Sequence, residues 1–133
     1  MDSPQTFTLH RVRPREATTR TPYLHQGSSR ATFSTFYGDP QRQRLAGISD
    51  YGPGTIQISF PTYDEMLFVL DGEATVTPHG GEPFEMEAGD AIYFVKGTVT
   101  DWAIRKTVRD LWCVIADAPL DEEWREWFPA GSE

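Results

Sequence analysis

The sequence predicts an all-β protein whose strands pair antiparallel in a sandwich or a barrel. Two observations support this: short alternating or apolar runs recur along the chain, and turn residues separate them at regular spacing. The 133 residues fit one domain, 1–133, which is long enough to bury a core without disulfides. Within it we expect an arm over 1–30, a barrel over 31–118, and a helix and tail over 119–133.

Nine runs of this kind are expected to be strands, and glycine-containing turns separate several of them. The turns are Asp71-Gly72, 79–82, 88–90 and 96–97, where glycine provides the positive φ that tight hairpins require. The expected strands are 7–12, 31–37, 55–60, 65–70, 73–78, 83–87, 91–95, 100–104 and 110–116.

Three segments depart from the strand pattern. Residues 13–30 and 38–53 are rich in Pro, Gly, Thr, Ser and Arg, so we expect long loops or arms there. A helix is expected over 121–128, because Asp121 is a suitable N-cap and acidic residues follow in the first turn. The aromatic residues on one face of this helix, which we expect to pack on the barrel or on a dimer partner, are Trp124, Trp127 and Phe128.

The net charge of −8 is unevenly distributed along the chain. Residues 1–44 hold seven arginines against three acids, a net +4, whereas residues 45–133 hold five basic and seventeen acidic side chains, a net −12. We expect the basic arm to lie on the acidic body of its own or of a neighbouring subunit. The alternative, nucleic-acid binding by the arm, is disfavoured because an acidic body repels phosphate and the arm lacks interleaved aromatic residues.

No segment indicates export or a membrane. The N-terminal residues lack the apolar core of a signal peptide, and no run approaches the ~18 apolar residues that a membrane helix needs. The single cysteine, Cys113, rules out an intramolecular disulfide and suits a reducing compartment. We therefore expect a cytoplasmic protein with no nucleic-acid and no membrane partner.

The middle of the chain carries regularly spaced glycines around one acid. Gly54 precedes an alternating strand, Glu65 begins an apolar strand, and Gly72 follows that acid after six intervening residues. Further along, Gly89 and Gly97 frame another apolar strand. A short apolar strand with a single acid suggests that the acid faces the interior of the domain.

With this spacing, residues 54–104 resemble the two motifs of the cupin superfamily. The resemblance is strongest to the branch of small cupins that contains the ethanolamine-utilisation protein EutQ, and (S)-ureidoglycine aminohydrolase is similar at a greater distance. It implies an antiparallel jelly-roll barrel and a homodimer, but no single reaction, because one fold hosts many functions. Features typical of the branch are Asp64-Glu65, Trp102 and Val108-Arg109.

The histidines that bind metal in cupins are missing here. With Glu65 as the reference, the His-x-His places fall on Ser59 and Pro61, or one residue earlier on each, and the third His place falls on Thr100. A transition-metal site needs three or four converging His, carboxylate or thiolate ligands, which Glu65 alone does not provide. We therefore predict no metal and no cofactor. The alternative is a metal site completed from the arm, with His25 folding over the barrel mouth.

Glu65 is predicted to point into the barrel and to meet apolar and aromatic walls there. Burial should raise its pKa, which suits a general acid or base, and we expect a Ser, Thr or Tyr hydroxyl within hydrogen-bond reach. The alternative is a purely structural acid with ordinary aromatic core around it. Strand alternation and the motif places predict the ligand-contacting residues: Gln57, Ser59, Tyr63, Tyr93, Thr100, Trp102 and Trp112.

A pocket of this composition predicts a protein that binds a small molecule, and three functions stay open. The first is a metal-independent enzyme of the isomerase, cyclase, dehydratase or lyase type, with Glu65 as the catalytic acid or base. The second is a non-catalytic metabolite-binding or accessory protein of the same shape. The third is a metal-dependent cupin whose ligands come partly from the N-terminal arm.

Overall fold

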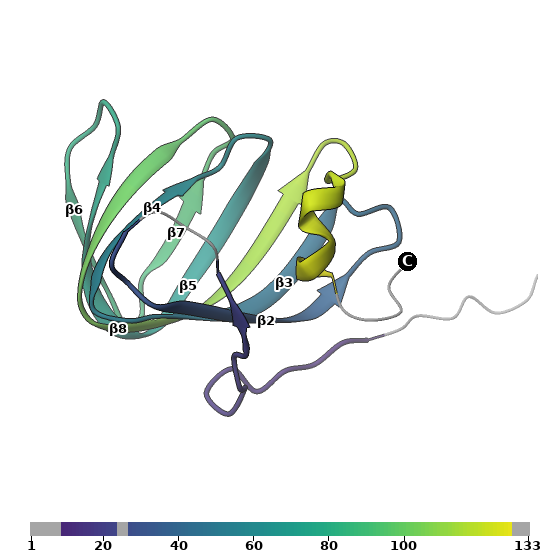
Figure 1. Ribbon diagram of the computed structural model, residues 1–133, viewed down its shortest axis with the longest axis horizontal. Helices are drawn as coiled ribbons and strands as arrows, with labels where there is room; N and C mark the ends of the chain where they lie inside the picture. The colour runs from purple at the N-terminus through teal and green to yellow at the C-terminus, as the bar shows by residue number, and fades with distance from the viewer. Residues whose placement is uncertain (1–8, 24–26, 129–133) are drawn as a thin grey trace, which may run out of the picture.

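The computed structural model describes residues 9–23 and 27–128, which form an antiparallel jelly roll with one short helix (Figure 1). The strand order is β1-β2-β3-β8-β5-β6, with β4 also pairing with β8 and β7 with β5. The predicted all-β antiparallel class is confirmed. The elements are β1 (Thr21–Pro22), β2 (Ala31–Gly38), β3 (Arg44–Tyr51), β4 (Gly54–Ser59), β5 (Tyr63–Pro78), β6 (Phe84–Glu87), β7 (Ala91–Phe94), β8 (Val99–Ala116) and the 3-10 helix η1 (Glu122–Trp127).

The long strands β5 and β8 run through both halves of the barrel and bend midway. One half of β8 pairs with β3 and the other half pairs with β4, while β5 follows β8 along both halves. The register of β5 shifts repeatedly between Val69 and Ala74. Gly72 lies at this irregularity with φ +104°, and a Cβ there would lie 2.3 Å from the Thr107 carbonyl oxygen. The bulge lets the sheet curl on itself and enclose a core.

The bulge corrects two expectations about the strands. Asp71-Gly72 is not a hairpin turn, so the expected strands 65–70 and 73–78 are parts of the single strand β5. In the same way, 100–104 and 110–116 are parts of β8. A glycine with positive φ serves a bulge as well as a turn, so the dipeptide alone could not distinguish them.

The expectation of a loop over 38–53 is also wrong, because residues 44–51 form β3 between β2 and β8. Gly47 in this strand is needed for packing: a Cβ there would lie 2.3 Å from Cζ2 of Trp112. Of the expected strand 7–12, the described residues 9–12 form no strand, and residues 7 and 8 lie outside the described part.

The core consists of inward-facing side chains from both halves of the curled sheet. Trp102, Trp112 and Phe60 are its largest fully buried members, and Phe60 stacks on Phe94 with ring centroids 4.6 Å apart.

Within the described residues, no helix is long and apolar enough to span a bilayer.

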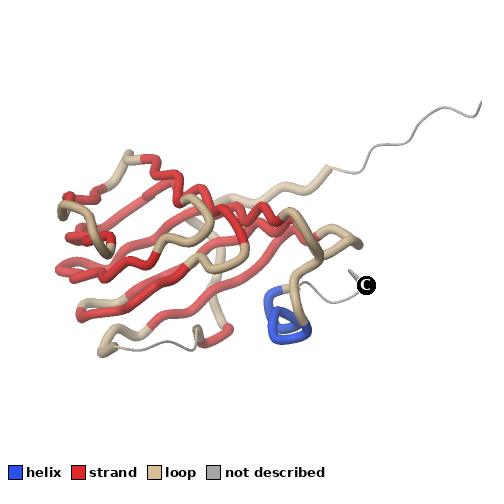
Figure 2. The backbone as a smooth tube through the Cα atoms, turned by 90° about the horizontal axis from the view of Figure 1, so that it is seen from above, coloured by secondary structure: helices blue, strands red, loops and turns tan. Residues whose placement is uncertain are grey.

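The expected C-terminal helix is present as a 3-10 helix that packs against one end of the barrel (Figures 1 and 2). Asp121 takes the N-cap position but makes no capping hydrogen bond with its side chain. Trp127 stacks on Phe33 of β2 with ring centroids 3.8 Å apart, and it meets Trp112 of β8 edge-on at 5.3 Å. The helix therefore places its aromatic residues over the barrel interior.

Candidate functional site

A small cavity lies inside the barrel beneath η1. Its volume is about 10 Å³, which is about the space that one water molecule occupies. Four strands contribute to its wall, as do the residue that follows β1 and two residues of η1. The lining residues are Tyr23, Ser49, Tyr51, Ile58, Tyr63, Glu65, Trp112, Trp124 and Trp127.

Glu65 borders this cavity, so its predicted inward orientation is confirmed. It lies on β5 between Val114 of β8 and Phe94 of β7, both of which are buried. Burial raises the pKa of Glu65 to about 8, and no hydrogen bond or opposite charge from residues 9–23 or 27–128 offsets that burial. The expected hydrogen bond from a nearby hydroxyl is therefore not formed, and the carboxyl keeps its proton at pH 7.

A second buried carboxyl, Asp110, was not identified from the sequence. It lies on β8 opposite Ser49 of β3 and Val69 of β5, and it is completely buried. Neither of its oxygens has a hydrogen-bond partner. Burial, together with the charges of Glu65 and Asp50, raises the pKa of Asp110 well above its usual range. The signal was available, because Asp110 has the same strand parity as Trp112.

Three tyrosines near the cavity remain neutral over the physiological range. Burial and the charge of Glu65 raise the pKa of Tyr23 to about 12, and burial followed by the charges of Asp110 and Glu65 raises the pKa of Tyr51 far above its usual range. Burial and Glu65 raise the pKa of Tyr63 in the same direction. The Tyr63 hydroxyl donates to the Ser59 carbonyl at 3.2 Å. Near neutral pH these phenols therefore present uncharged hydroxyls, and the hydroxyl proton of Tyr63 is already donated to Ser59.

An open cleft of about 360 Å³ lies on the other side of the aromatic wall. It shares Tyr23, Tyr63, Trp124 and Trp127 with the inner cavity. The remaining lining residues come from β1, β2, the β4–β5 segment and the start of η1: Pro22, Phe33, Ser59, Pro61, Thr62 and Asp121. Four aromatic side chains thus separate the solvent-accessible cleft from the carboxyl of Glu65.

Of the other predicted site residues, four point inward. Tyr63 and Trp112 line the cavity, and Trp102 is core. Thr100 is fully buried: its hydroxyl donates to the Ile58 carbonyl at 2.9 Å and accepts from Trp102 Nε1 at 2.9 Å. The Thr100 hydroxyl is therefore used within the protein.

The inward placement of Gln57 and Tyr93 is wrong. Gln57 lies on the outer face and donates to Asp101 at 3.3 Å, and the exposed Tyr93 donates to Asp64 at 2.6 Å. Ser59 is also exposed and borders the cleft, not the cavity. The pairing of β4 with β8 places the isoleucines of β4 inside the barrel. A register error of one residue in the prediction moves every side chain of a strand to the opposite face.

The described residues do not fit the metal set that the cupin resemblance would imply. Within 9–23 and 27–128, no three His, Cys, Asp or Glu side chains converge on a common point. At the former ligand places, Ser59 and Pro61 are exposed and Thr100 is already hydrogen-bonded on both sides. His25 lies outside the described residues.

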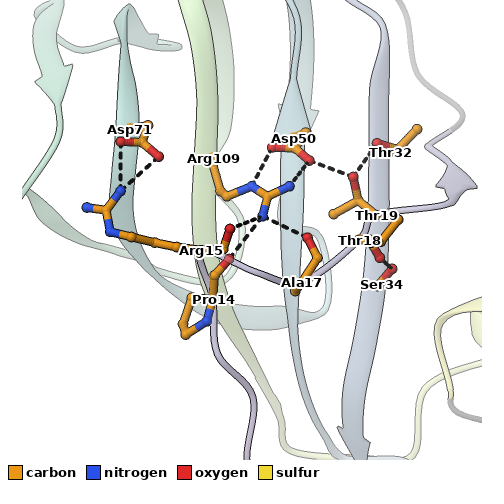
Figure 3. A network of polar contacts seen from close by, with 10 residues as sticks. All are labelled: Pro14, Arg15, Ala17, Thr18, Thr19, Thr32, Ser34, Asp50, Asp71 and Arg109. Carbon is orange, nitrogen blue, oxygen red and sulfur yellow. Dashed lines mark hydrogen bonds and ion pairs between the residues drawn. The ribbon is translucent and has the colours of Figure 1, made fainter.

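The described part of the arm crosses the outer face of the barrel and is held there by Arg109 of β8 (Figure 3). The guanidinium donates to both carboxylate oxygens of Asp50, at 2.9 and 2.7 Å, and to the carbonyls of Pro14 at 3.0 Å and Ala17 at 2.7 Å. Arg15 pairs with Asp71 at 2.9 Å. This places the basic arm on the acidic body of its own subunit.

This clamp matters for the site because the arm leads directly to Tyr23. Thr19 donates to Asp50 at 2.6 Å and lies 2.7 Å from the Thr32 hydroxyl, after which β1 pairs with β2. Burial raises the pKa of Asp50, but hydrogen bonds from Arg109 and Thr19 outweigh it and leave that pKa below the usual value. The ionised clamp therefore positions one wall of the cavity.

The curled antiparallel jelly-roll barrel is the fold of the cupin superfamily, and Glu65 lies on its inner side near the start of β5. The chain belongs to the EutQ-like cupin domain family, whose model matches residues 38–110. No curated protein matches the sequence.

Solved structures support this assignment. The chain is similar to EutQ from Clostridium difficile, with TM-score 0.57 and 17% identity over 67% of this chain and 70% of that one. It is similar to ethanolamine utilization protein Q from Salmonella typhimurium, with TM-score 0.58 and 18% identity over 75% and 98%. A protein described as a predicted oxalate decarboxylase from Thermotoga maritima gives TM-score 0.62 and 17% identity over 79% and 97%. Likeness at these identities shows the fold and does not define a reaction.

Proposed function

We propose that this protein is a cupin that binds a small molecule in its barrel and transfers a proton through Glu65 without a metal. The observation that supports the proposal most strongly is the unpaired carboxyl of Glu65 on the wall of a cavity. A pKa of about 8 lets that carboxyl hold a proton at pH 7 and still exchange it near neutrality. Isomerase, cyclase, dehydratase and lyase reactions all contain such a step.

In this proposal each cavity residue has a separate role. Glu65 donates its proton to a developing oxyanion or leaving group, or removes a proton once it has ionised. The neutral hydroxyls of Tyr51 and Tyr63 orient the substrate, and Trp112 provides an apolar surface. The closed aromatic wall keeps water from the reacting atoms, which strengthens electrostatic interactions inside.

An NMR screen tests the proposal because it detects binding and turnover together. Mixtures of small neutral, anionic and cationic metabolites are incubated with the wild type, with Glu65→Gln, and with Glu87→Gln, which makes the same change at an exposed site on β6. An enzyme broadens the resonances of its substrate and generates product resonances, and Glu65→Gln abolishes the product but keeps the broadening. Conversion by Glu65→Gln at the wild-type rate would refute the catalytic role.

The second candidate is a non-catalytic metabolite-binding protein. The observation that favours it is that the open cleft of about 360 Å³ can hold a ligand, whereas the inner cavity of about 10 Å³ leaves no room for a substrate beside Glu65 unless the wall moves. In the same screen this function predicts broadening without any new resonance, and a change in affinity alone for Glu65→Gln.

We also propose that the protein is a homodimer. The outer face of β5, β7 and β8 exposes large apolar side chains, whereas the rest of the body is strongly acidic. A second copy that offers the same face would cover them without bringing acidic surfaces together. The exposed residues are Met66, Phe68, Tyr93, Val95 and Ile115. Light scattering at micromolar concentration should give twice the chain mass of 15.1 kDa, and a monomer mass would reject the dimer.

A further inference from the structure

We propose that the ligand of the barrel is a small organic cation, whose ammonium group binds between the carboxyl of Glu65 and the aromatic rings that close the barrel. This inference rests on the proposed ligand-binding function and adds the chemical class of the ligand. Three features of the interior support it: its charge, its aromatic wall and its access route.

The interior contains acids and no base to pair with them. In the described part of the chain, Asp110 is completely buried with both oxygens unpartnered, and nothing offsets the burial of Glu65. The nearest arginine clamp, Arg109 with Asp50, acts on the outer face and holds the arm. Burying a carboxyl without a partner costs free energy. A ligand cation would therefore meet a carboxyl that no other positive group already pairs with.

The rings around Glu65 are arranged as a box. Tyr23 meets Trp127 at 84° with centroids 5.3 Å apart, and Tyr63 meets Trp124 at 88° and 4.9 Å. All four rings line the cavity that Glu65 borders, and within each pair the two rings stand nearly perpendicular. An ammonium group is attracted to the faces of Trp and Tyr rings, and most strongly where water is excluded. A neutral ligand would contact the same rings but would not provide the positive charge that favours ionisation of the acid.

The access route also favours a cation. The cleft outside the aromatic wall is lined by Asp121, whose carboxylate attracts positive charge. Of the four rings that line both spaces, Trp124 and Trp127 belong to η1, so a displacement of this one helix would remove two of them and open a path from the cleft toward the cavity. At the start of the helix, Arg42 Nη2 donates to the Asp121 carbonyl at 2.5 Å. The helix has six residues and no side-chain cap hydrogen bond, so it can open by local unfolding, at the cost of the ring contacts of Trp127 with Phe33 and Trp112.

A bound cation should draw the proton from Glu65. The titratable groups around this acid all have raised pKa values, and Glu65 is the carboxyl that borders the cavity, so it is the one that a bound cation would ionise. The described side chains of η1 that line the cavity are Trp124 and Trp127, which do not titrate. The titratable neighbours are Asp110 and Cys113 on β8, Tyr51 on β3, Tyr63 on β5, and Tyr23 after β1.

Calorimetry with choline and its neutral carbon isostere, 3,3-dimethylbutan-1-ol, tests the inference. Choline has no dissociable ammonium proton, so any proton released on binding comes from the protein. Titrations in two buffers with different ionisation enthalpies at pH 7 should show release of about 0.9 proton per choline, and little release at pH 9.5. The affinity for choline should rise about tenfold per pH unit from pH 6 toward pH 8, and the alcohol should bind at least about tenfold more weakly at pH 8.

The variants separate charge recognition from simple packing. Glu65→Gln should weaken choline binding about tenfold or more and abolish proton release, while leaving the weak binding of the alcohol unchanged. Glu87→Gln should behave as the wild type, and circular dichroism confirms that each variant is folded.

Equal affinity for choline and the alcohol, or undiminished proton release by Glu65→Gln, would overturn the inference. If choline fails to bind but a neutral or anionic metabolite from the NMR screen occupies the barrel, the cation class is wrong and the proposed function survives. If no molecule of either set binds, both fall.

Discussion

Replacing Glu65 by Gln should stabilise the protein at alkaline pH, although the substitution removes a group that we place in the site. The wild type must bury a carboxyl that prefers to ionise, whereas the amide has no charge to bury. Glu65→Gln keeps the shape of the side chain, so packing in the barrel changes little. The effect of the substitution on stability is therefore mainly electrostatic and depends on pH.

The magnitude follows from the two pKa values of Glu65. In the unfolded chain the carboxyl loses its proton near its ordinary value of 4.5, and in the barrel only near 8. Between these values the folded state holds one more proton than the unfolded state, so the wild type loses stability as pH rises. At 1.36 kcal/mol per pH unit, the loss amounts to about 5 kcal/mol between pH 4.5 and pH 8, and it stays constant above.

Urea unfolding at several pH values between 5 and 9 measures this directly. The free energy of unfolding of Glu65→Gln minus that of the wild type should increase by up to about 1.4 kcal/mol per pH unit and become constant near pH 8. Other groups titrate in both proteins and largely cancel in the difference, except for Asp110, whose pKa the charge of Glu65 raises. Glu87→Gln provides the matched control and should show no such trend. A difference that is constant from pH 5 to pH 9 would show that Glu65 ionises normally and would refute its raised pKa.

Three further substitutions and one metal analysis test other parts of the structure. Trp127→Ala should lower the free energy of unfolding by about 2 kcal/mol and also lower the pKa of Glu65, because water then reaches the cavity; an unchanged pH profile would contradict this. Arg109→Lys cannot reproduce the forked contacts to Asp50 and the arm, so a loss of about 1–3 kcal/mol and faster hydrogen exchange over 14–20 are expected; exchange at the wild-type rate would contradict the clamp. Gly47→Ala should cost at least about 1–3 kcal/mol and perturb Trp112 fluorescence, since the new Cβ overlaps that ring; wild-type stability would disprove the close contact. Elemental analysis of protein purified without added metal should find well under one transition-metal ion per chain, and a stoichiometric metal would refute the metal-free proposal.

Sequence reasoning identified the fold because its main signals are local. The spacing from Glu65 to Gly72, the alternating runs and the glycine turns each reflect backbone geometry that a few neighbouring residues determine. It missed β3 because Gly47 and Ser49 weaken the strand pattern, although both are buried between β2 and β8. Such residues are accepted in a central strand when large partners such as Trp112 fill the space above them.

The sequence predicted the orientation of a site residue correctly only where the residue's own strand determines that orientation. Glu65 lies among residues of clear alternation on β5, so its inward direction followed from its own strand. Gln57 and Tyr93 failed because their orientation depends on the register with a partner strand, which local sequence does not specify. The cavity wall needs Tyr23 and Trp127, which are more than one hundred residues apart, so no local pattern could bring them together.

The proton affinity of Glu65 consequently depends on segments that do not belong to its own motif. Burial alone raises its pKa, and that burial is completed by Tyr23 from the arm and by Trp127 from η1. The arm is held by Arg109 and the helix by Arg42, both on the outside of the barrel. A substitution at either arginine should therefore loosen one wall, admit water and shift the Glu65 pKa downward without touching the acid itself. A ligand that opens the wall from the cleft must also admit water and lower the Glu65 pKa, unless its own atoms replace the rings that it displaces. The aromatic wall thus controls both the entry of a ligand and the acidity of Glu65.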